Sequence, residues 1–223
     1  MKIIALLASP QGLKGNTSGL LRYVVEGAKA EGADTEIIVL KGDKVLPCLA
    51  CGTCHKKGSC LQKDDFQSIK AKIAGAEGLI LASPNYIFNV SAQMKAFMDR
   101  CVGVVHCMQF WGKYGASLVT SGGDGEEAIP EYMNQFLIMT GAVPVGTVSA
   151  NMSAMPSGDF TEELRERARA LGRKLVTEWR AGQVLPEVEA RRNAFRDRMC
   201  AVMPWRKEEW PYEYRYWKEG MGL

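Results

Sequence analysis

The sequence predicts an α/β fold in which a doubly wound, five-stranded parallel sheet is covered by helices on both faces. Short apolar runs alternate five times with segments of helical length and spacing, which is the pattern of strand–helix–strand units. The apolar runs are nearly continuous rather than alternating, as strands buried on both faces of a parallel sheet require. The elements can be assigned in chain order from this pattern.

The five expected strands are the apolar runs at residues 3–9, 35–40, 78–83, 115–121 and 142–148. Apolar residues that recur every three or four positions predict helices between and after them, over residues 20–28, 69–76, 94–101, 133–137 and 164–179. Ser91 and Thr161 precede two of these stripes and are expected to cap the helices.

The chain of 223 residues is long enough for one α/β domain with an appendage. We expect residues 1–182 to form the domain and residues 183–223 to form a C-terminal extension. The extension should begin with an Arg-rich amphipathic helix over 186–201 and continue with six aromatic residues in positions 204–217. Such a segment must pack its rings on something, so we expect a subunit contact or a lid over the ligand site.

Composition and charge narrow the functional class. Hydrophobic residues make up 47% of the chain and charged residues 24%, and the net charge is only +3. A small net charge with interspersed signs argues against nucleic acid or a membrane surface as the partner. The first apolar run is too short for a membrane span and lacks the cleavage site of a signal peptide, so we expect a cytoplasmic protein.

The loop SPQGLKGNTS (9–18) lies between the first strand and the first helix, at the edge where open α/β sheets bind ligands. Its glycines allow a tight turn, and its hydroxyl and amide side chains adjoin the free N–H groups of a helix N-terminus. This combination suits a phosphate, although it matches neither the Walker loop nor the dinucleotide fingerprint. The alternative is an ordinary turn in which Asn16 or Thr17 caps the helix.

Two more loops end at the same edge of the sheet. SPNYIFNVSAQMKAFMDR (83–100) follows the third strand and places Tyr86 and Phe88 at the rim, and TSGGDGEE (120–127) follows the fourth. The glycine pair in the latter permits close approach of a flat ligand. A phosphate loop, an aromatic loop and a glycine loop that converge indicate a mononucleotide pocket. Either aromatic residue alone could instead be a covering residue.

These three loops are similar to the flavin loops of the flavodoxin-like NAD(P)H-dependent FMN reductases, and the resemblance covers roughly residues 1–180. It implies a flavodoxin-like strand order of 2-1-3-4-5 and a homodimer or homotetramer with each flavin near a subunit interface. It implies that FMN binds through its phosphate to Ser9, Gln11, Asn16, Thr17 and Ser18, and through its ring to Pro84, Asn85, Tyr86, Ile87, Phe88, Asn89, Ser121, Gly122 and Gly123.

The stretch PCLACGTCHKKGSC (47–60) carries four of the seven cysteines and belongs to a cysteine-rich loop, 47–61, after the second strand. Its spacing resembles that of the iron–sulfur flavoproteins, a branch of the same reductases in which four thiolates hold a [4Fe–4S] cluster near FMN. The resemblance implies that the metal ligands are Cys48, Cys51, Cys54 and Cys60. Two-residue spacings bend a short chain so that successive thiolates reach different irons.

Three alternatives to a cluster remain for this stretch. The cysteines could hold zinc, although structural zinc usually draws ligands from two separated pairs, and His55 could compete as a ligand. They could form a redox dithiol, although such pairs normally sit at a helix start. They could also belong to a cluster-free loop, because related flavodoxin-like reductases carry similar loops.

Other reactive residues have simpler interpretations. Buried small hydrophobes are the default for isolated cysteines, here Cys101, Cys107 and Cys200. His106 beside Cys107 is a poor nucleophile pair because adjacent residues rarely point the right way. The carboxylates in the fourth-strand loop are expected to be favourable charges at a helix start, namely Asp124, Glu126 and Glu127. No catalytic side chain is expected, because a flavin carries the chemistry itself.

The sequence therefore predicts an FMN-dependent oxidoreductase that passes electrons between NAD(P)H or a ferredoxin-like donor, FMN and a [4Fe–4S] cluster. A ferredoxin-like protein or a small molecule would be the acceptor or donor. One alternative is a cluster-free NAD(P)H-dependent FMN or quinone reductase. Another is a non-enzymatic zinc module whose C-terminal extension binds a partner. No arginine marks a 2′-phosphate site, so the choice between NADH and NADPH is open.

Overall fold

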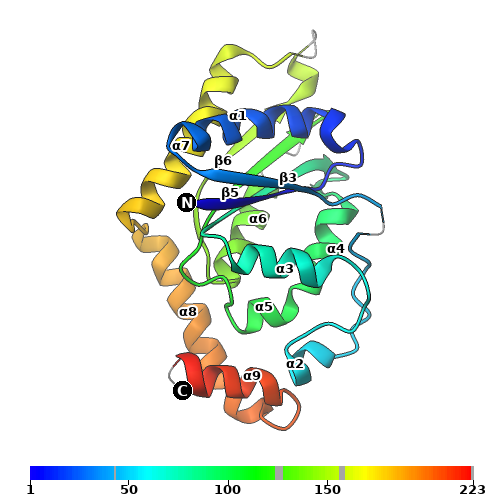
Figure 1. The fold of residues 1–223 in the computed structure, drawn as a ribbon, viewed down its shortest axis with the longest axis vertical. Coiled ribbons are helices and arrows are strands. Elements are labelled where there is room, and N and C mark those ends of the chain that lie inside the picture. The colour runs from blue at the N-terminus through cyan, green and yellow to red at the C-terminus, as the bar shows by residue number, and fades with distance from the viewer. Residues whose placement is uncertain (43, 124–127, 156–158, 222–223) are drawn as a thin grey trace.

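In the computed structural model, five parallel strands form a sheet with helices on both faces (Figure 1). The structure describes residues 1–42, 44–123, 128–155 and 159–221. The parallel strands are β1 (Lys2–Leu7), β2 (Asp34–Val39), β3 (Gly78–Tyr86), β5 (Tyr114–Ser121) and β6 (Val143–Asn151). The short strand β4 (Asn89–Val90) pairs antiparallel with the end of β3. The predicted α/β class is confirmed.

The strands lie in the order β2-β1-β3-β5-β6, which for the five parallel strands counted along the chain is 2-1-3-4-5. Strand β1 lies inside the sheet, with Leu7 opposite Val39 of β2 on one side and Ala82 of β3 on the other. Every residue from Ile3 to Ala8 is fully buried, which explains the unbroken apolar run. The direction of winding reverses between β1 and β3, where open α/β sheets form a ligand crevice.

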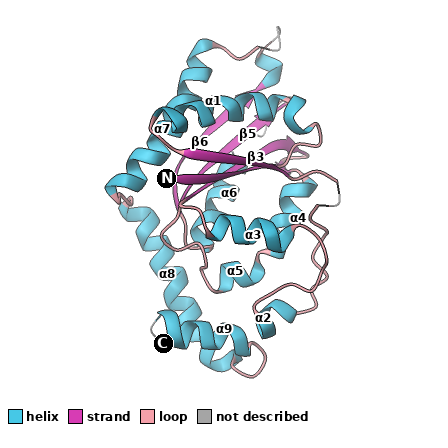
Figure 2. Cartoon of the chain, viewed as in Figure 1, coloured by secondary structure: helices cyan, strands magenta, loops and turns pink. Residues whose placement is uncertain are grey.

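Helices cover both faces of the sheet (Figure 2). Alternate β1 side chains point to opposite faces, so that Ile3 and Leu7 contribute to one core cluster and Ile4 and Leu6 to the other. The first cluster packs under α1 (Asn16–Ala30) and α7 (Glu162–Ala181). The second packs under α3 (Phe66–Ala74), α4 (Ala92–Arg100) and α6 (Ala128–Met139).

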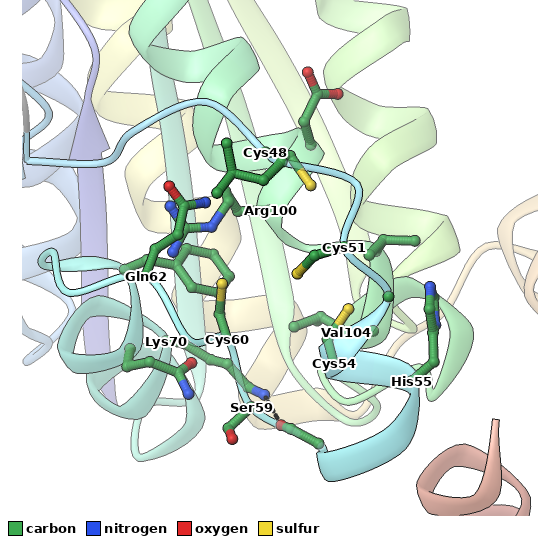
Figure 3. Close-up of a pocket in the computed structure, with 18 of the residues that line it drawn as sticks. Cys48, Cys51, Cys54, His55, Ser59, Cys60, Gln62, Lys70, Arg100 and Val104 are labelled. Carbon is green, nitrogen blue, oxygen red and sulfur yellow. Dashed lines mark hydrogen bonds between the residues drawn. The ribbon is translucent and has the colours of Figure 1, made fainter. Parts of the chain in front are cut away.

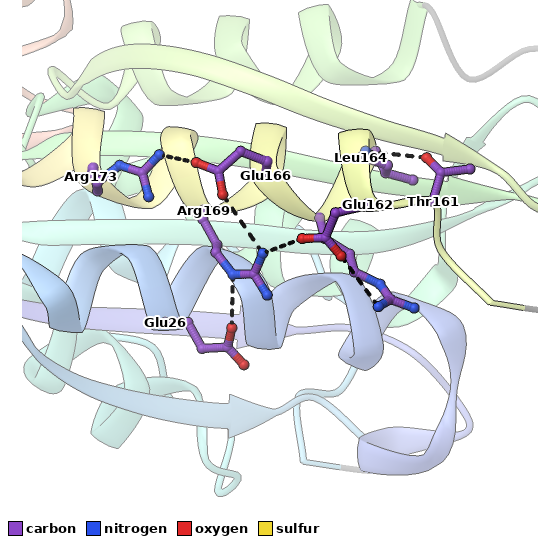
Figure 4. Close-up of polar contacts among 8 residues, drawn as sticks. Glu26, Thr161, Glu162, Leu164, Glu166, Arg169 and Arg173 are labelled. Carbon is purple, nitrogen blue, oxygen red and sulfur yellow. Dashed lines mark hydrogen bonds and ion pairs between the residues drawn. The ribbon is translucent and has the colours of Figure 1, made fainter.

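Helices α1 and α7 touch through their backbones. A methyl group placed on Gly27 would come within 1.9 Å of the Arg169 carbonyl oxygen, and one placed on Gly172 would come equally close to the Val24 carbonyl oxygen. Next to this contact, Arg169 bridges Glu26 of α1 at 3.2 Å and Glu162 of α7 at 3.0 Å (Figure 4). These ion pairs are largely exposed, so the close backbone contact contributes more to the helix packing than they do.

The remaining chain includes several short helices. They are the single turns η1 (Gly12–Lys14) and η2 (Met152–Ala154), and the helices α2 (Thr53–Lys57) and α5 (Val102–His106). After α8 (Pro186–Val202), the chain continues through η3 (Met203–Arg206), α9 (Pro211–Tyr216) and η4 (Trp217–Met221). We call residues 203–221 the C-terminal segment. It folds back so that α9 lies beside α2 (Figure 1).

The sequence predicted the long helices and their caps well. Ser91 accepts a hydrogen bond from the Met94 amide at 3.3 Å, and Thr161 accepts one from the Leu164 amide at 3.2 Å. Periodicity did not reveal α2 or α5, because helices of five residues are too short to show a repeating stripe. No helix in the described ranges has the length and apolar character to cross a membrane.

Candidate flavin and cysteine sites

The first loop joins β1 to the N-terminus of α1. Gly12 adopts a positive φ of 58° and donates its amide to the Ser9 carbonyl oxygen at 2.8 Å, which closes the turn. Gly15 occupies the cap position of α1, and no side chain caps the helix. The interpretation of this loop as a turn capped by Asn16 or Thr17 is therefore wrong. An uncapped N-terminus leaves backbone N–H groups directed at the ligand edge, where they favour an anion.

Hydroxyl groups surround this helix end. Ser9, Thr17 and Ser18 are almost fully buried, and Ser18 Oγ donates to the Gly15 carbonyl oxygen at 2.8 Å. Gly15 is enclosed, since a methyl group there would lie 2.9 Å from Gln11 Oε1. The other predicted phosphate ligand, Asn16, is exposed at the first helical position. All five predicted phosphate ligands thus lie around one turn.

The second loop is a tight hairpin at the end of β3. Asn85 pairs with Val90 and Tyr86 with Asn89, which leaves Ile87 and Phe88 as the two turn residues. Both have positive φ angles, 49° and 59°. This is the backbone of a type I′ turn, which strongly prefers Asn and Gly, and a β-branched residue there is strained. The turn nevertheless presents two large apolar side chains that are 91% and 73% exposed.

The third loop leaves β5 beside this hairpin. Asn85 Nδ2 donates to Ser121 Oγ at 3.2 Å, which joins the second and third loops directly. Ser121 Oγ also lies 2.7 Å from the Gly123 carbonyl oxygen and 3.2 Å from the Gly123 nitrogen. A methyl group placed on Gly122 or Gly123 would meet no atom of the residues that the structure describes within 4 Å, chain neighbours aside. The predicted helix-start carboxylates Asp124, Glu126 and Glu127 lie outside the described residues.

Two further hydrogen bonds connect the first loop with the others. The hydroxyls of Thr17 and Thr120 lie 2.7 Å apart, between α1 and β5. Ser91 Oγ, at the start of α4, donates to the Ala8 carbonyl oxygen at 2.6 Å. The three predicted flavin loops therefore form one connected edge. Sequence reasoning missed Thr120, whose role depends on a partner 103 positions away.

The four clustered cysteines line a single cavity of about 390 Å³ (Figure 3). Two left-handed glycines, Gly52 at φ 69° and Gly58 at φ 75°, bracket the short helix α2 and turn the chain around this cavity. The two N-terminal cysteines are exposed and the two C-terminal ones are partly buried. Their sulfurs are directed into the same space. One continuous stretch thus brings four thiols to the same cavity, those of Cys48, Cys51, Cys54 and Cys60.

A buried ion pair holds both ends of the cysteine loop. Arg100, the last residue of α4, contacts both carboxylate oxygens of Asp64 at 2.6 and 3.1 Å and also donates to the Leu46 carbonyl oxygen at 2.9 Å. Asp64 in turn accepts the amides of Leu46 and Phe66. Burial alone would raise the pKa of Asp64, but the hydrogen bonds from Arg100 and the two amides outweigh it and lower that pKa.

The thiols have different electrostatic surroundings. A hydrogen bond between Cys51 Sγ and Thr53 Oγ1 at 3.4 Å lowers the pKa of Cys51. Burial, together with the nearby Glu213 carboxylate, raises the pKa of Cys54. Burial also raises the pKa of Cys101 and Cys107, which lie outside the loop. These two are fully buried core residues, as predicted, whereas Cys200 is only half-buried.

The two histidines belong to a separate cluster. His55 Nδ1 lies 2.7 Å from Glu213 Oε1, and His106 Nδ1 lies 3.0 Å from Glu213 Oε2. His55 also lines the cysteine cavity, and its Nδ1 is directed to Glu213 of α9. A nucleophile pair of His106 with Cys107 is not favoured, because the thiol is fully buried.

The C-terminal segment closes one side of the cysteine cavity. Tyr212 lines the cavity, and a methyl group placed on Gly58 would come within 2.3 Å of its ring. Trp217 is fully buried and donates its Nε1–H to the His106 carbonyl oxygen at 2.9 Å. The aromatic composition predicted that this segment packs on something, and the structure shows that it packs on α2 and α5.

Comparison with known proteins agrees with this architecture. The family model for NADPH-dependent FMN reductase matches residues 1–155. An iron–sulfur flavoprotein of Archaeoglobus fulgidus is 37% identical over 177 residues, which is 79% of each chain. One of Methanosarcina thermophila is 33% identical over 151 residues, 66% of this chain and 78% of that protein.

Solved structures show the same fold. An NAD(P)H:quinone oxidoreductase from Methanothermobacter marburgensis superposes with a TM-score of 0.58 at 20% identity, covering 79% of this chain and 97% of that one. Fold, family model and relatives all agree, and the protein is a flavin-dependent oxidoreductase. The chain belongs to the NADPH-dependent FMN reductase family and, within it, to the iron–sulfur flavoproteins.

Proposed function

We propose that this protein exchanges electrons between FMN at the three-loop edge and a [4Fe–4S] cluster held by Cys48, Cys51, Cys54 and Cys60. One observation carries the proposal: all four thiols line one cavity, and a single helix joins that cavity to the flavin edge. Ser91 caps helix α4 and is hydrogen-bonded to Ala8, just before the first loop, and to Ser83, the first residue of the second. The helix ends at Arg100, which lines the cavity. Its nine residues span about 13 Å.

The residues around the first loop fit the FMN phosphate. The uncapped α1 N-terminus and the buried hydroxyls of Ser9, Thr17 and Ser18 supply hydrogen-bond donors without a competing carboxylate in the predicted set. The ring would lie against the hairpin turn and the Ser121–Gly123 loop. Reduction of the flavin would place negative charge near N1 of the ring. The Gly123 nitrogen is already hydrogen-bonded to Ser121 Oγ, so we propose that the Gly122 amide donates to that position and stabilises the charge.

The thiol arrangement fits a cluster better than a single zinc ion. Tetrahedral zinc with Zn–S bonds of about 2.3 Å brings its four sulfurs to about 3.8 Å from one another. Among the described residues, the four cavity cysteines do not form a close donor group like that of His55, His106 and Glu213. A cubane binds one thiolate at each of four separate irons, so thiols that line a shared cavity without meeting at one point suit it better.

When bound, FMN would supply two-electron exchange with NAD(P)H and one-electron exchange with the cluster. The chain's own part is to position the two groups, exclude water and set the local charge. Arg100 and Lys70 line the cavity and would offset the negative charge of a four-thiolate cluster. The external donor or acceptor would be a ferredoxin-like protein or a small molecule.

The exposed apolar side chains at the flavin edge support the proposed homodimer or homotetramer. Leu13, Ile87 and Phe88 are each at least 60% exposed and lie on two neighbouring flavin loops. Apolar groups gathered in this way usually meet a ligand or a partner. All seven cysteines are free, which suits the reducing cytoplasm that we propose as the location.

The test is a cofactor analysis of protein purified without oxygen. We expect FMN, about four iron and about four acid-labile sulfide per chain, with cluster absorption that dithionite bleaches. FMN without iron would instead support a cluster-free FMN or quinone reductase. Zinc with a sulfur shell and no flavin would support the zinc module. Flavin reduction by NADH and NADPH, followed in a stopped-flow instrument, then identifies the preferred donor.

A further inference from the structure

Two histidines and one glutamate from three separate segments meet beside the cysteine cavity. His55 lies in α2, His106 ends α5, and Glu213 lies in α9. Each imidazole approaches its own oxygen of the same carboxylate, at 2.7 Å and 3.0 Å. One donor atom from each residue lies within 4.8 Å of the other two, and the described part of the chain holds no other such trio of His, Cys, Asp or Glu.

The carboxylate at the centre of this cluster is buried, and the two imidazoles are partly exposed. The Glu213 side chain is 0% exposed, and the two imidazoles are 15% and 22% exposed. Within the described ranges, no lysine or arginine nitrogen comes within 4.0 Å of the Glu213 carboxylate. A buried carboxylate without a compensating positive charge is costly. A cation bound between the three side chains would supply that charge.

The donor set and its dimensions suit a divalent transition metal. Two histidines with one carboxylate are a common ligand set of zinc, which leaves a fourth position for water. Zinc bonds of about 2.1 Å in a tetrahedral arrangement separate the donors by about 3.4 Å. The nitrogen–oxygen separations of 2.7 and 3.0 Å would have to lengthen by about 0.7 Å and about 0.4 Å.

Neighbouring tryptophans hold the histidines in place. The Trp210 ring stacks on His55 at 5.0 Å between ring centroids and lies tilted against His106 at 4.8 Å. The buried Trp217 donates to the His106 carbonyl oxygen and fixes the end of α5. Outer contacts of this kind orient metal ligands and raise affinity. The trio is thus preorganised by groups that do not belong to the cysteine loop.

We propose that His55, His106 and Glu213 bind a divalent metal ion of the zinc class at a site distinct from the four cysteines. The ion supplies the missing positive charge and fastens the C-terminal segment to the helix that carries Cys54. Metal binding here requires neither FMN nor a cluster, so a test of this site does not depend on whether the proposed electron transfer is correct.

The decisive measurement is zinc-edge X-ray absorption on the full-length protein, purified without oxygen, reconstituted with iron and sulfide, and then supplied with one equivalent of Zn²⁺. We expect a first shell of nitrogen and oxygen at about 2.0–2.1 Å and no sulfur at about 2.3 Å. Iron and sulfide counted in the same sample show whether the cluster is present. A sulfur shell, or no zinc retained after gel filtration, overturns the proposal.

Two variants and a matched control locate the site. Glu213→Gln and His106→Gln should each weaken zinc binding by about 100-fold or more, a loss at least as large as that seen when outer-shell partners are removed. Glu208→Gln alters an exposed glutamate of the same segment and should leave the affinity unchanged. Zinc affinity is measured by competition with a chromophoric chelator, and iron content should stay constant across the series.

Tryptophan fluorescence shows whether Glu213→Gln has merely released the C-terminal segment. If it has, His106→Gln, which removes a ligand from α5 instead, decides the assignment. Wild-type affinity in both ligand variants would mean that the trio is only a hydrogen-bonded clamp with a proton on one imidazole. The absorption spectrum of the wild-type protein needs no variant and remains decisive if both variants unfold.

Discussion

Arg100 and Asp64 form a buried, two-point ion pair that ties the end of α4 to both ends of the cysteine loop. The side chains are 1% and 3% exposed, so neither charge can turn to water if its partner is lost. The start of the same helix is bonded to the flavin edge through Ser91. One helix therefore sets the position of both proposed redox sites.

Replacing Asp64 by Asn should release the cysteine loop. The change leaves the Arg100 charge buried without a counter-charge, which typically costs about 3–5 kcal/mol. We expect reduced iron content after anaerobic reconstitution and a lower midpoint of unfolding. Asp65→Asn is the control, because that neighbouring carboxylate is 54% exposed and forms a long ion pair with Lys44, at 3.9 Å. Equal iron content in the two variants would contradict the anchoring role.

The pH dependence of this anchor has a definite sign. The pKa of Asp64 is lowered in the folded protein relative to an unfolded value of about 3.9. Its contribution to stability is therefore complete at neutral pH, persists down to about pH 4, and is lost only as the pH falls through the folded pKa. The amides of Leu46 and Phe66 both donate to Asp64. Their hydrogen-exchange protection, followed against pH in iron-free protein, measures how long the anchor holds. Loss of protection above pH 5 would argue against it.

Replacing Cys60 by Ser should remove the cluster and leave the flavin. Serine keeps the size of the side chain but removes the thiolate that the fourth iron requires. FMN content should be unchanged, because the flavin loops follow β1, β3 and β5 rather than β2. Cys200→Ser, a half-buried cysteine of α8, should keep both cofactors. A Cys60→Ser protein with full iron content would exclude this residue as a ligand.

Replacing Gly122 by Val should affect FMN and not the fold. A Cβ at this position meets no atom of the described residues within 4 Å, apart from its chain neighbours, so the unfolding midpoint of the flavin-free protein should not move. The new methyl groups would occupy the space that we assign to the flavin ring. We expect FMN to bind at least about tenfold more weakly, or about 1.4 kcal/mol, in a fluorescence titration. Unchanged affinity would place the ring elsewhere.

The strained hairpin turn offers a test in the opposite direction. Changing Ile87 to Asn and Phe88 to Gly supplies the residues that a type I′ turn prefers, and should stabilise the flavin-free protein by about 1 kcal/mol. FMN affinity or the oligomeric state should decline, because two exposed apolar side chains are lost. Leu13→Asn, at an exposed position with an ordinary backbone, separates relief of strain from added polarity. No gain in stability would show that the turn is not strained.

The sequence predicted those features that depend on local pattern. Continuous apolar runs predicted the strands, and position in the α/β repeat identified the three loops of the flavin edge. The cysteine spacing identified the loop that surrounds the cavity. Each of these signals lies within a few consecutive residues, so it can be read without knowledge of the fold.

Features that depend on distant partners could not be predicted in this way. Arg100 pairs with Asp64, which lies 36 positions earlier in the chain, and Glu213 contacts His55, which lies 158 positions earlier. Nothing in either local sequence identifies the partner. The aromatic residues of the C-terminal segment indicated that it must pack, but only the structure shows that Tyr212 fills the space above Gly58. Five-residue helices such as α2 are also too short to be recognised from a repeating apolar pattern.

The packing of Tyr212 and Glu213 against the cysteine loop has a consequence for biosynthesis. The 158 positions between His55 and Glu213 take the ribosome on the order of 10–30 s to translate. Throughout this interval the cysteine loop has been made and the wall that covers it has not. A scaffold that delivers iron and sulfide would meet a fully open loop on the nascent chain, whereas in the finished protein Tyr212 closes one side of the cavity.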